Sequence, residues 1–218
     1  MTVVFVALLL LTYKRFPLSH ISYTLIFVFM ILHTIGAHYT YAEVPYDNWA
    51  KALFGVGINE IFGFTRNHYD RLVHFSFGFL MAYPVREIFL RIVNVKGFWG
   101  YYLPLDVMAA FSMVYELIEW AVALAFGGEL EMTYLGTQGD IWDAHKDMAL
   151  ATLGALITVL VVAFINYRYK PGFKEEIENS LSVKRKTPLG EVELERMKKK
   201  EARRNTGSKG HYLRKKLY

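Results

Sequence analysis

The sequence predicts an all-α, polytopic membrane protein: a transmembrane helical bundle of about five spans, followed by a charged cytoplasmic C-terminal tail. Of the 218 residues, 54% are hydrophobic, and they form long apolar blocks. Several blocks reach or approach the roughly 20 residues that a membrane-crossing helix needs. Many of the 15 Tyr, 16 Phe and 4 Trp lie near the block ends, where amphipathic rings suit the headgroup region. Basic residues gather in alternate connecting segments, as a multi-span topology requires.

The predicted spans cover residues 1–13, 21–41, 70–92, 99–126 and 147–167. The first is short, and Lys14 and Arg15 follow it. A secretory signal peptide instead carries its positive charge before the apolar run and a small-residue cleavage site after it. We therefore interpret residues 1–13 as a short or truncated helix.

The later spans have boundaries or interruptions of their own. Pro84 is expected to kink the third span. The fourth span is long enough to tilt, or to break near Pro104. The dipeptide Pro171-Gly172 closes the fifth span.

The positions of Lys and Arg predict the orientation. They gather after the first span, between the third and fourth spans, and after the fifth. Five crossings place these segments on one side, which the positive-inside rule assigns to the cytoplasm. The opposite segments, about residues 43–69 and 127–146, are richer in carboxylates. The C-terminus is therefore expected in the cytoplasm.

Charge also divides the chain into a transmembrane domain, residues 1–167, and a basic tail, residues 168–218. The tail has 16 Lys/Arg against 7 Asp/Glu, a balance of +9, whereas the preceding residues carry −4. The tail is expected to fix the orientation, or to lie against anionic lipid, where each basic residue contributes roughly 1 kcal/mol. It has few interleaved aromatics and no recognised motif, so nucleic acid is not an expected partner. The chain has no cysteine, which excludes disulfides and thiolate metal sites.

Ionisable residues inside the spans are the strongest indication of a functional site, because insertion scales assign roughly 2.5–3.5 kcal/mol to an Asp, Lys or Arg at a helix centre. Asp70 and His74 are four residues apart and share a helix face. Glu116 and Glu119 lie within an apolar block, where two close carboxylates need a proton or a cation. His33 and His38 are roughly 140° apart on a helix, so one of them is expected to be a packing residue.

Asp140, Asp143 and Asp147 would form one stripe on a helix at the entry to the fifth span. An acidic helix start explains part of this pattern. The topology brings all these groups toward the extracytoplasmic side. The candidate catalytic residues are Glu116, Glu119 and His74, and the candidate metal ligands are His33, His38, Asp70, His74, Glu116, Glu119, Asp140, Asp143 and Asp147. A structural role, in hydrogen bonds or ion pairs that hold the bundle together, is the alternative.

Several long segments resemble the YjdF family of bacterial inner-membrane proteins over most of residues 20–165. These segments read HTIGAHYTYAEVPYD, RNHYDRLVHFSFGFLMAYPVRE, YELIEW and YLGTQGDIWDAHKDMALATLGA. The resemblance implies a multi-pass protein of the inner (plasma) membrane and no particular reaction. A more distant similarity is to VanZ-like membrane proteins, linked to glycopeptide resistance. It rests on Asp70-Arg71 with His74, on Glu116 and on Asp140 to Asp147, and it departs at Glu119 and Asp147.

These observations favour a membrane protein that binds or acts on a lipid, a lipid-linked substrate or an envelope component. A metal-dependent intramembrane enzyme with a divalent ion is one alternative, since imidazole and carboxylates suit such ions. A proton- or cation-coupled transporter is another, because paired intramembrane glutamates relay charge. Membrane lipids are the expected partners, and the sequence leaves the substrate, metal and oligomeric state open.

Overall fold

The computed structural model describes the backbone of residues 2–126, 138–184 and 186–214, with side chains from residue 5 and up to residue 201. Every regular element in these ranges is helical, which confirms the all-α class. The elements are α1 (Thr2–Thr12), α2 (His20–His38), α3 (Tyr46–Phe54), α4 (Ile58–Phe62), α5 (Tyr69–Ile88), a π-helical turn η1 (Phe89–Val93), α6 (Trp99–Phe126), α8 (Asp143–Tyr169), α9 (Phe173–Leu181) and α10 (Leu189–Arg214).

Within the described residues, three helices have the length and apolarity to cross a membrane: α2, α6 and α8. They coincide with the second, fourth and fifth predicted spans. The 11-residue α1 is short, as expected, since at about 1.5 Å per residue it covers about half of a hydrocarbon core roughly 30 Å thick. Helix α5 carries the charged pattern that begins at Asp70. The count of five spans stays a prediction.

The chain divides by its contacts into two units, Met1–Ser180 and Leu181–Tyr218. In the second unit, the side chains of residues 189–201 in α10 are exposed. In the first unit, α9 contacts the start of α6. The Glu176 carboxylate and the Ser180 hydroxyl accept hydrogen bonds from the backbone N–H groups of Gly97 and Phe98, at 3.1 and 2.9 Å. Gly97 and Phe98 directly precede α6, so these bonds fix the segment that leads into the helix.

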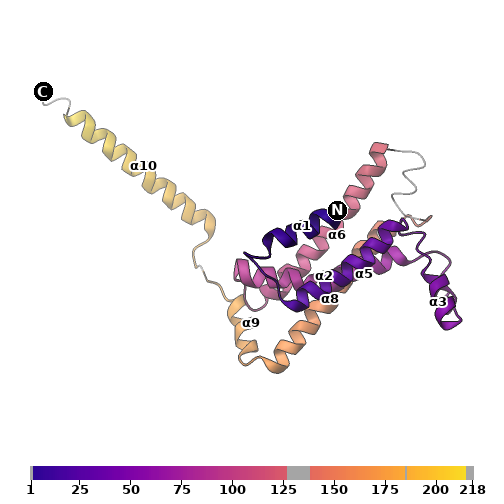
Figure 1. Ribbon diagram of the computed structural model, residues 1–218. Helices are drawn as coiled ribbons and strands as arrows, with labels where there is room; N and C mark the ends of the chain where they lie inside the picture. Colours follow the sequence, from indigo (N-terminus) through magenta and orange to yellow (C-terminus); the bar gives the residue numbers. More distant parts are fainter. Residues whose placement is uncertain (1, 127–137, 185, 215–218) are drawn as a thin grey trace. The chain divides into compact units, whose positions relative to one another are not determined.

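Helix α5 packs against α2, α6 and α8, and its crossing with α8 is the closest of these (Figure 1). Gly78 of α5 faces the backbone of Ala151, and Gly154 of α8 faces the backbone of Phe75. Small residues let two helix backbones approach in this way within a membrane. The crossing fixes the register between α5 and α8, and therefore the positions of the polar residues near their first turns.

The end of α5 is joined to the start of α2. The Glu87 carboxylate accepts hydrogen bonds from Ser19 N at 2.9 Å and from Ser22 Oγ at 2.6 Å. It also forms an ion pair with Arg91 at 2.7 Å. Helix α5 continues through Pro84 and passes into the π-helical turn η1. This end of the bundle holds the basic residues that predict the cytoplasmic side.

The opposite end is organised by the segment before α5. Asn67 donates to the Val44 carbonyl at 2.9 Å, and its backbone exchanges two hydrogen bonds with the Gln138 side chain, both at 3.1 Å. The Tyr69 hydroxyl donates to the Leu32 carbonyl at 3.0 Å. These bonds bring the ends of α2, α5 and α8 to one level. Residues 127–137 of the predicted acidic segment lie outside the described residues.

Candidate functional site

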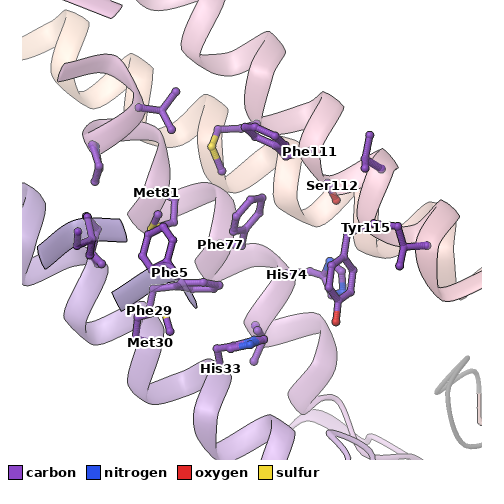
Figure 2. Close-up of a pocket in the computed structure, with 18 of the residues that line it drawn as sticks. Phe5, Phe29, Met30, His33, His74, Phe77, Met81, Phe111, Ser112 and Tyr115 are labelled. Atoms are coloured by element: carbon purple, nitrogen blue, oxygen red, sulfur yellow. The ribbon is translucent and has the colours of Figure 1, made fainter. Parts of the chain in front are cut away.

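A cavity of about 550 Å³ lies between α1, α2, α5 and α6 (Figure 2). Its wall is almost entirely apolar: Phe5 and Leu9 come from α1, and many of the remaining residues are Phe, Met, Val, Leu and Ile. Three wall residues of α6 are also exposed on the surface of the bundle, namely Phe111, Val114 and Ile118. The cavity is therefore open along α6.

One end of this cavity is polar. His33, His74 and Tyr115 lie there, beyond the aromatic and methionine side chains that fill the other part of the view (Figure 2). Tyr41 and Asp70 complete this end, and the Tyr41 hydroxyl lies 2.7 Å from His33 Nδ1. An apolar pocket with a few convergent polar groups is the usual form of a small-molecule site.

A second group of polar residues continues from this end into the bundle. We call Asp70, His74, Glu116 and Asp147 the carboxylate–histidine cluster. His74 Nε2 lies 3.7 Å from Asp70 Oδ1 and 3.5 Å from Glu116 Oε1. One donor atom from each of Asp70, His74 and Asp147 lies within 4.8 Å of the other two. His74 and Asp147 are 7% and 2% exposed.

Beside it lies the arginine–aspartate cluster, which consists of Arg66, Arg71, Asp140 and Asp143. Arg66 Nη2 donates to Asp143 Oδ1 at 2.5 Å, and Arg71 Nη2 donates to Asp140 Oδ2 at 2.6 Å and to Asp143 Oδ1 at 3.1 Å. Asp143 is only 2% exposed, and a charge buried to this extent needs a partner. The two guanidinium groups provide the compensating positive charge. Lys146 adds an ion pair to Asp140 at 2.5 Å.

The environment of two groups in this region changes their acidity. The Lys146 hydrogen bond, together with the Trp142 N–H and Arg71, lowers the pKa of Asp140 to about 2. His68 precedes α5, and burial and the charges of Arg71 and Arg66 lower the pKa of its imidazole. Asp140 is therefore an anion and His68 a neutral ring at neutral pH.

The predicted site residues have different surroundings in the structure. Asp70, His74, Glu116 and Asp147 come together in one cluster, whereas Asp140 and Asp143 pair with arginines. His33 lies at the polar end of the cavity but pairs with Tyr41. Glu119 is half-buried and is hydrogen-bonded to Tyr115.

Two sequence expectations change in detail. His38 is exposed and packs edge-on against Tyr39 at 4.7 Å between ring centroids, so it is apart from the cluster. Asp140 precedes α8, which begins at Asp143, so the acidic stripe on the helix contains only Asp143 and Asp147. Asp140 lies in a turn, and its contacts are with cations.

Sequence reasoning missed the partners of these residues. Arg66 and Arg71 flank Asp70, and an acidic segment follows in the chain, which was the available signal for their pairing. Tyr41, Ser112 and Tyr115 line the cavity, and no sequence signal separates them from the other hydroxyl residues of the spans.

Comparison with known proteins confirms the resemblance to the YjdF family. A family described as "Predicted membrane protein (DUF2238)" matches residues 1–168. The chain is similar to the inner membrane protein YjdF of Escherichia coli (strain K12), with 43% identity over 167 residues that make up 76% of each chain. No solved structure matches. The similarity to VanZ-like proteins stays a prediction.

Proposed function

The chain belongs to the DUF2238 family of predicted membrane proteins, and from this premise we propose that it is an inner-membrane protein that binds a lipid or a lipid-linked envelope component. The bound molecule places its hydrocarbon part between α1, α2, α5 and α6. Its polar head lies at the end formed by His33, Asp70, His74 and Tyr115. The inner-membrane location follows from the similarity to YjdF.

The observation that carries this proposal is the two-part character of the cavity. Its volume of about 550 Å³ falls within the range of roughly 300–1,000 Å³ that ligand sites occupy. Its apolar part suits a hydrocarbon chain, which forms no hydrogen bonds. The polar groups at one end suit a head group that needs hydrogen-bond partners.

The opening along α6 supports a lipid over a water-soluble ligand. Phe111, Val114 and Ile118 are both cavity wall and exposed surface of a helix that is apolar enough to span the membrane. In the proposed topology, these residues face hydrocarbon. A lipid enters between them from the bilayer and keeps its chain in an apolar environment throughout.

Lipid retention tests the proposal. The protein is reconstituted in nanodiscs of phosphatidylglycerol and phosphatidylethanolamine, released into detergent and examined by native mass spectrometry. We expect one lipid to remain on the wild-type chain. Ser112→Trp and Val85→Phe fill the cavity from α6 and α5, and each is expected to lower retention by about tenfold or more, which corresponds to about 1.4 kcal/mol.

Leu117→Trp is the matched control, because Leu117 lies on α6 but is exposed and does not line the cavity. Its retention should equal that of the wild type. The proposal is wrong if the wild-type chain retains no lipid, or if folded Ser112→Trp and Val85→Phe proteins retain as much as the control.

Chemistry on the bound molecule is a second candidate function, favoured by the 3.5 Å approach of His74 Nε2 to Glu116 Oε1 at the polar end. A buried carboxylate beside an imidazole can move a proton at a bound head group. In this case the Glu116→Gln variant retains unaltered lipid, whereas wild-type protein releases a modified one. Identical lipid masses after incubation with both proteins would exclude this activity for the lipids tested.

A further inference from the structure

We propose that Asp70, His74 and Asp147 of the carboxylate–histidine cluster bind one divalent transition-metal ion. The site would use one imidazole nitrogen and carboxylate oxygens from α5 and α8, and Glu116 of α6, whose Oε1 lies 3.5 Å from His74 Nε2, is the next carboxylate to it. Asp70 and His74 also line the polar end of the cavity, so the ion and the proposed lipid head group would be neighbours, but the ion needs only these side chains and the lipid chain needs only the apolar wall.

The spacing of the donor atoms is the first argument. His74 Nε2 is 3.7 Å from Asp70 Oδ1 and 3.5 Å from Glu116 Oε1. Both distances exceed the usual upper limit of about 3.2 Å for an N–H···O hydrogen bond. Donors that share a metal at about 2.0–2.2 Å stand about 3–3.5 Å apart. His74 is therefore too far from both carboxylates for direct hydrogen bonds. An Asp147 oxygen lies within 4.8 Å of the Asp70 and His74 donors, so a small inward movement would bring the three to the spacing of a coordination sphere.

The buried carboxylates supply the second argument. Among the described residues, Asp147 Oδ1 and Glu116 Oε1 are buried without a hydrogen-bond partner. Asp147 as a whole is 2% exposed. A buried carboxylate oxygen without a partner is unfavourable, and both oxygens belong to residues of the cluster. A cation among them satisfies both.

The neighbouring arginines neutralise only part of this negative charge. Arg66 and Arg71 are held in close ion pairs with Asp140 and Asp143. Their charges also act on Asp70 and Asp147, and two cations are thereby shared among more than two carboxylates. Three carboxylates in a low-dielectric region repel one another unless a proton or a metal ion lies between them.

The donor set indicates the class of metal. One imidazole with carboxylates suits Mn²⁺, Fe²⁺ or Zn²⁺, whereas Mg²⁺ and Ca²⁺ prefer oxygen ligands alone. Asp70 and His74 also line the cavity, whereas Asp147 does not. The coordination sphere therefore faces the polar end of the cavity, where an oxygen atom of a bound head group can complete it.

A Mn²⁺ titration tests the site. The protein is purified in detergent, treated with chelator, and titrated with Mn²⁺ while the signal of the free ion is followed by electron paramagnetic resonance. We expect one Mn²⁺ per chain, displaced by Zn²⁺ and not by an equal amount of Mg²⁺. Asp147→Asn and His74→Gln should each raise the apparent dissociation constant by at least about tenfold.

Asp106→Asn is the matched control, because Asp106 is an exposed carboxylate of α6 that lies ten residues, or about 15 Å, before Glu116 along the helix. It should bind Mn²⁺ as the wild type does. If Asp147→Asn fails to fold, the folded His74→Gln protein decides the outcome.

The proposal is overturned if folded wild-type protein binds neither Mn²⁺ nor Zn²⁺ in a one-to-one ratio. It is also overturned if the folded cluster variants bind as tightly as Asp106→Asn. Ser112→Trp separates the two proposals, since it should lose lipid and keep Mn²⁺. Loss of lipid retention alone would leave the metal site standing.

Discussion

Asp143 illustrates how a single buried charge organises the end of the bundle. Its side chain is 2% exposed and contacts guanidinium groups at 2.5 and 3.1 Å. Taking charges out of water is costly, so a buried pair is weak evidence for added stability. Removing one partner is strongly destabilising, because the remaining charge stays buried without full compensation.

We therefore expect Arg66→Met to destabilise the protein by about 3 kcal/mol, since it leaves Asp143 with Arg71 alone. The change is measured by unfolding in detergent micelles. Lys51→Met is the control, because Lys51 and Asp47 form an exposed pair at 3.0 Å on α3 and should contribute nothing measurable. Equal stability of the two variants would contradict this view of the arginine–aspartate cluster.

The lowered pKa of Asp140 predicts a pH dependence. Its ordinary value is 3.8 and its value in the folded chain is about 2, chiefly because of the Lys146 hydrogen bond. A lowered folded-state pKa means that the stabilisation is complete above the ordinary value and is lost as the pH falls toward 2. The difference in unfolding midpoint between wild type and Asp140→Asn should thus be equal at about pH 7 and 5 and smaller at about pH 3. If this difference in midpoint is already smaller at pH 5 than at pH 7, the assignment of the pH dependence to Asp140 is wrong.

The sequence predicts a contact between two residues best where the two lie close together in the chain. Asp70 and His74 are one helical turn apart, so their proximity follows from the helix alone. The pairing of Arg71 with Asp140 joins residues 69 positions apart. It depends on the packing of α5 against α8, which no local pattern contains.

Among the elements, the crossing of α5 and α8 depends on glycine. A Cβ atom on Gly78 would overlap the Ala151 carbonyl oxygen, and one on Gly154 would overlap the Phe75 carbonyl oxygen. These contacts are backbone atoms, which cannot move aside as a side chain can. A single methyl group at either position must separate the two helices.

We expect Gly78→Ala to lower stability by about 2 kcal/mol or more, because it inserts volume where two backbones touch. Gly100→Ala is the matched control on α6, since its Cβ would meet only the end of the Leu90 side chain at 3.1 Å. Thermal unfolding in micelles and Mn²⁺ binding are compared. If Gly78→Ala is as stable as Gly100→Ala, the close crossing is not as described.

Hydropathy predicts the apolar elements well and the others poorly. The fourth predicted span, residues 99–126, has the bounds of α6. The fifth begins four residues after the start of α8, because its first turn contains Asp143 and the apolar pattern starts later. The docking of α9 on the start of α6 combines hydrogen bonds to Gly97 and Phe98 with the packing of Phe173 against Tyr101, and none of these contacts belongs to an apolar block.

Across the whole molecule, the charge pattern predicts that the two ends of the bundle differ in their charged residues. The Glu87–Arg91 contacts lie at one end of α5, and the two clusters lie at the other. From the positive-inside rule we predict that the first end and the basic tail are cytoplasmic. The same prediction puts the carboxylate–histidine cluster on the extracytoplasmic side.

This orientation can be measured directly because the chain has no cysteine of its own. Glu60→Cys lies in the segment between α2 and α5, and Glu193→Cys lies in the tail, and both positions are exposed. A membrane-impermeant maleimide should label Glu60→Cys in intact cells and Glu193→Cys only after permeabilisation. The reverse pattern, or equal labelling, would refute the topology.

The position of α5 has a consequence for the synthesis of the chain. Unlike α2, α6 and α8, α5 is not among the described helices that are apolar enough to span a membrane on their own account. Its partners α6 and α8 leave the ribosome later, and Gly154 follows Gly78 by 76 residues. We therefore predict that α5, as a span, inserts stably only once those helices have arrived. A late segment of the chain would then determine the fate of an early one.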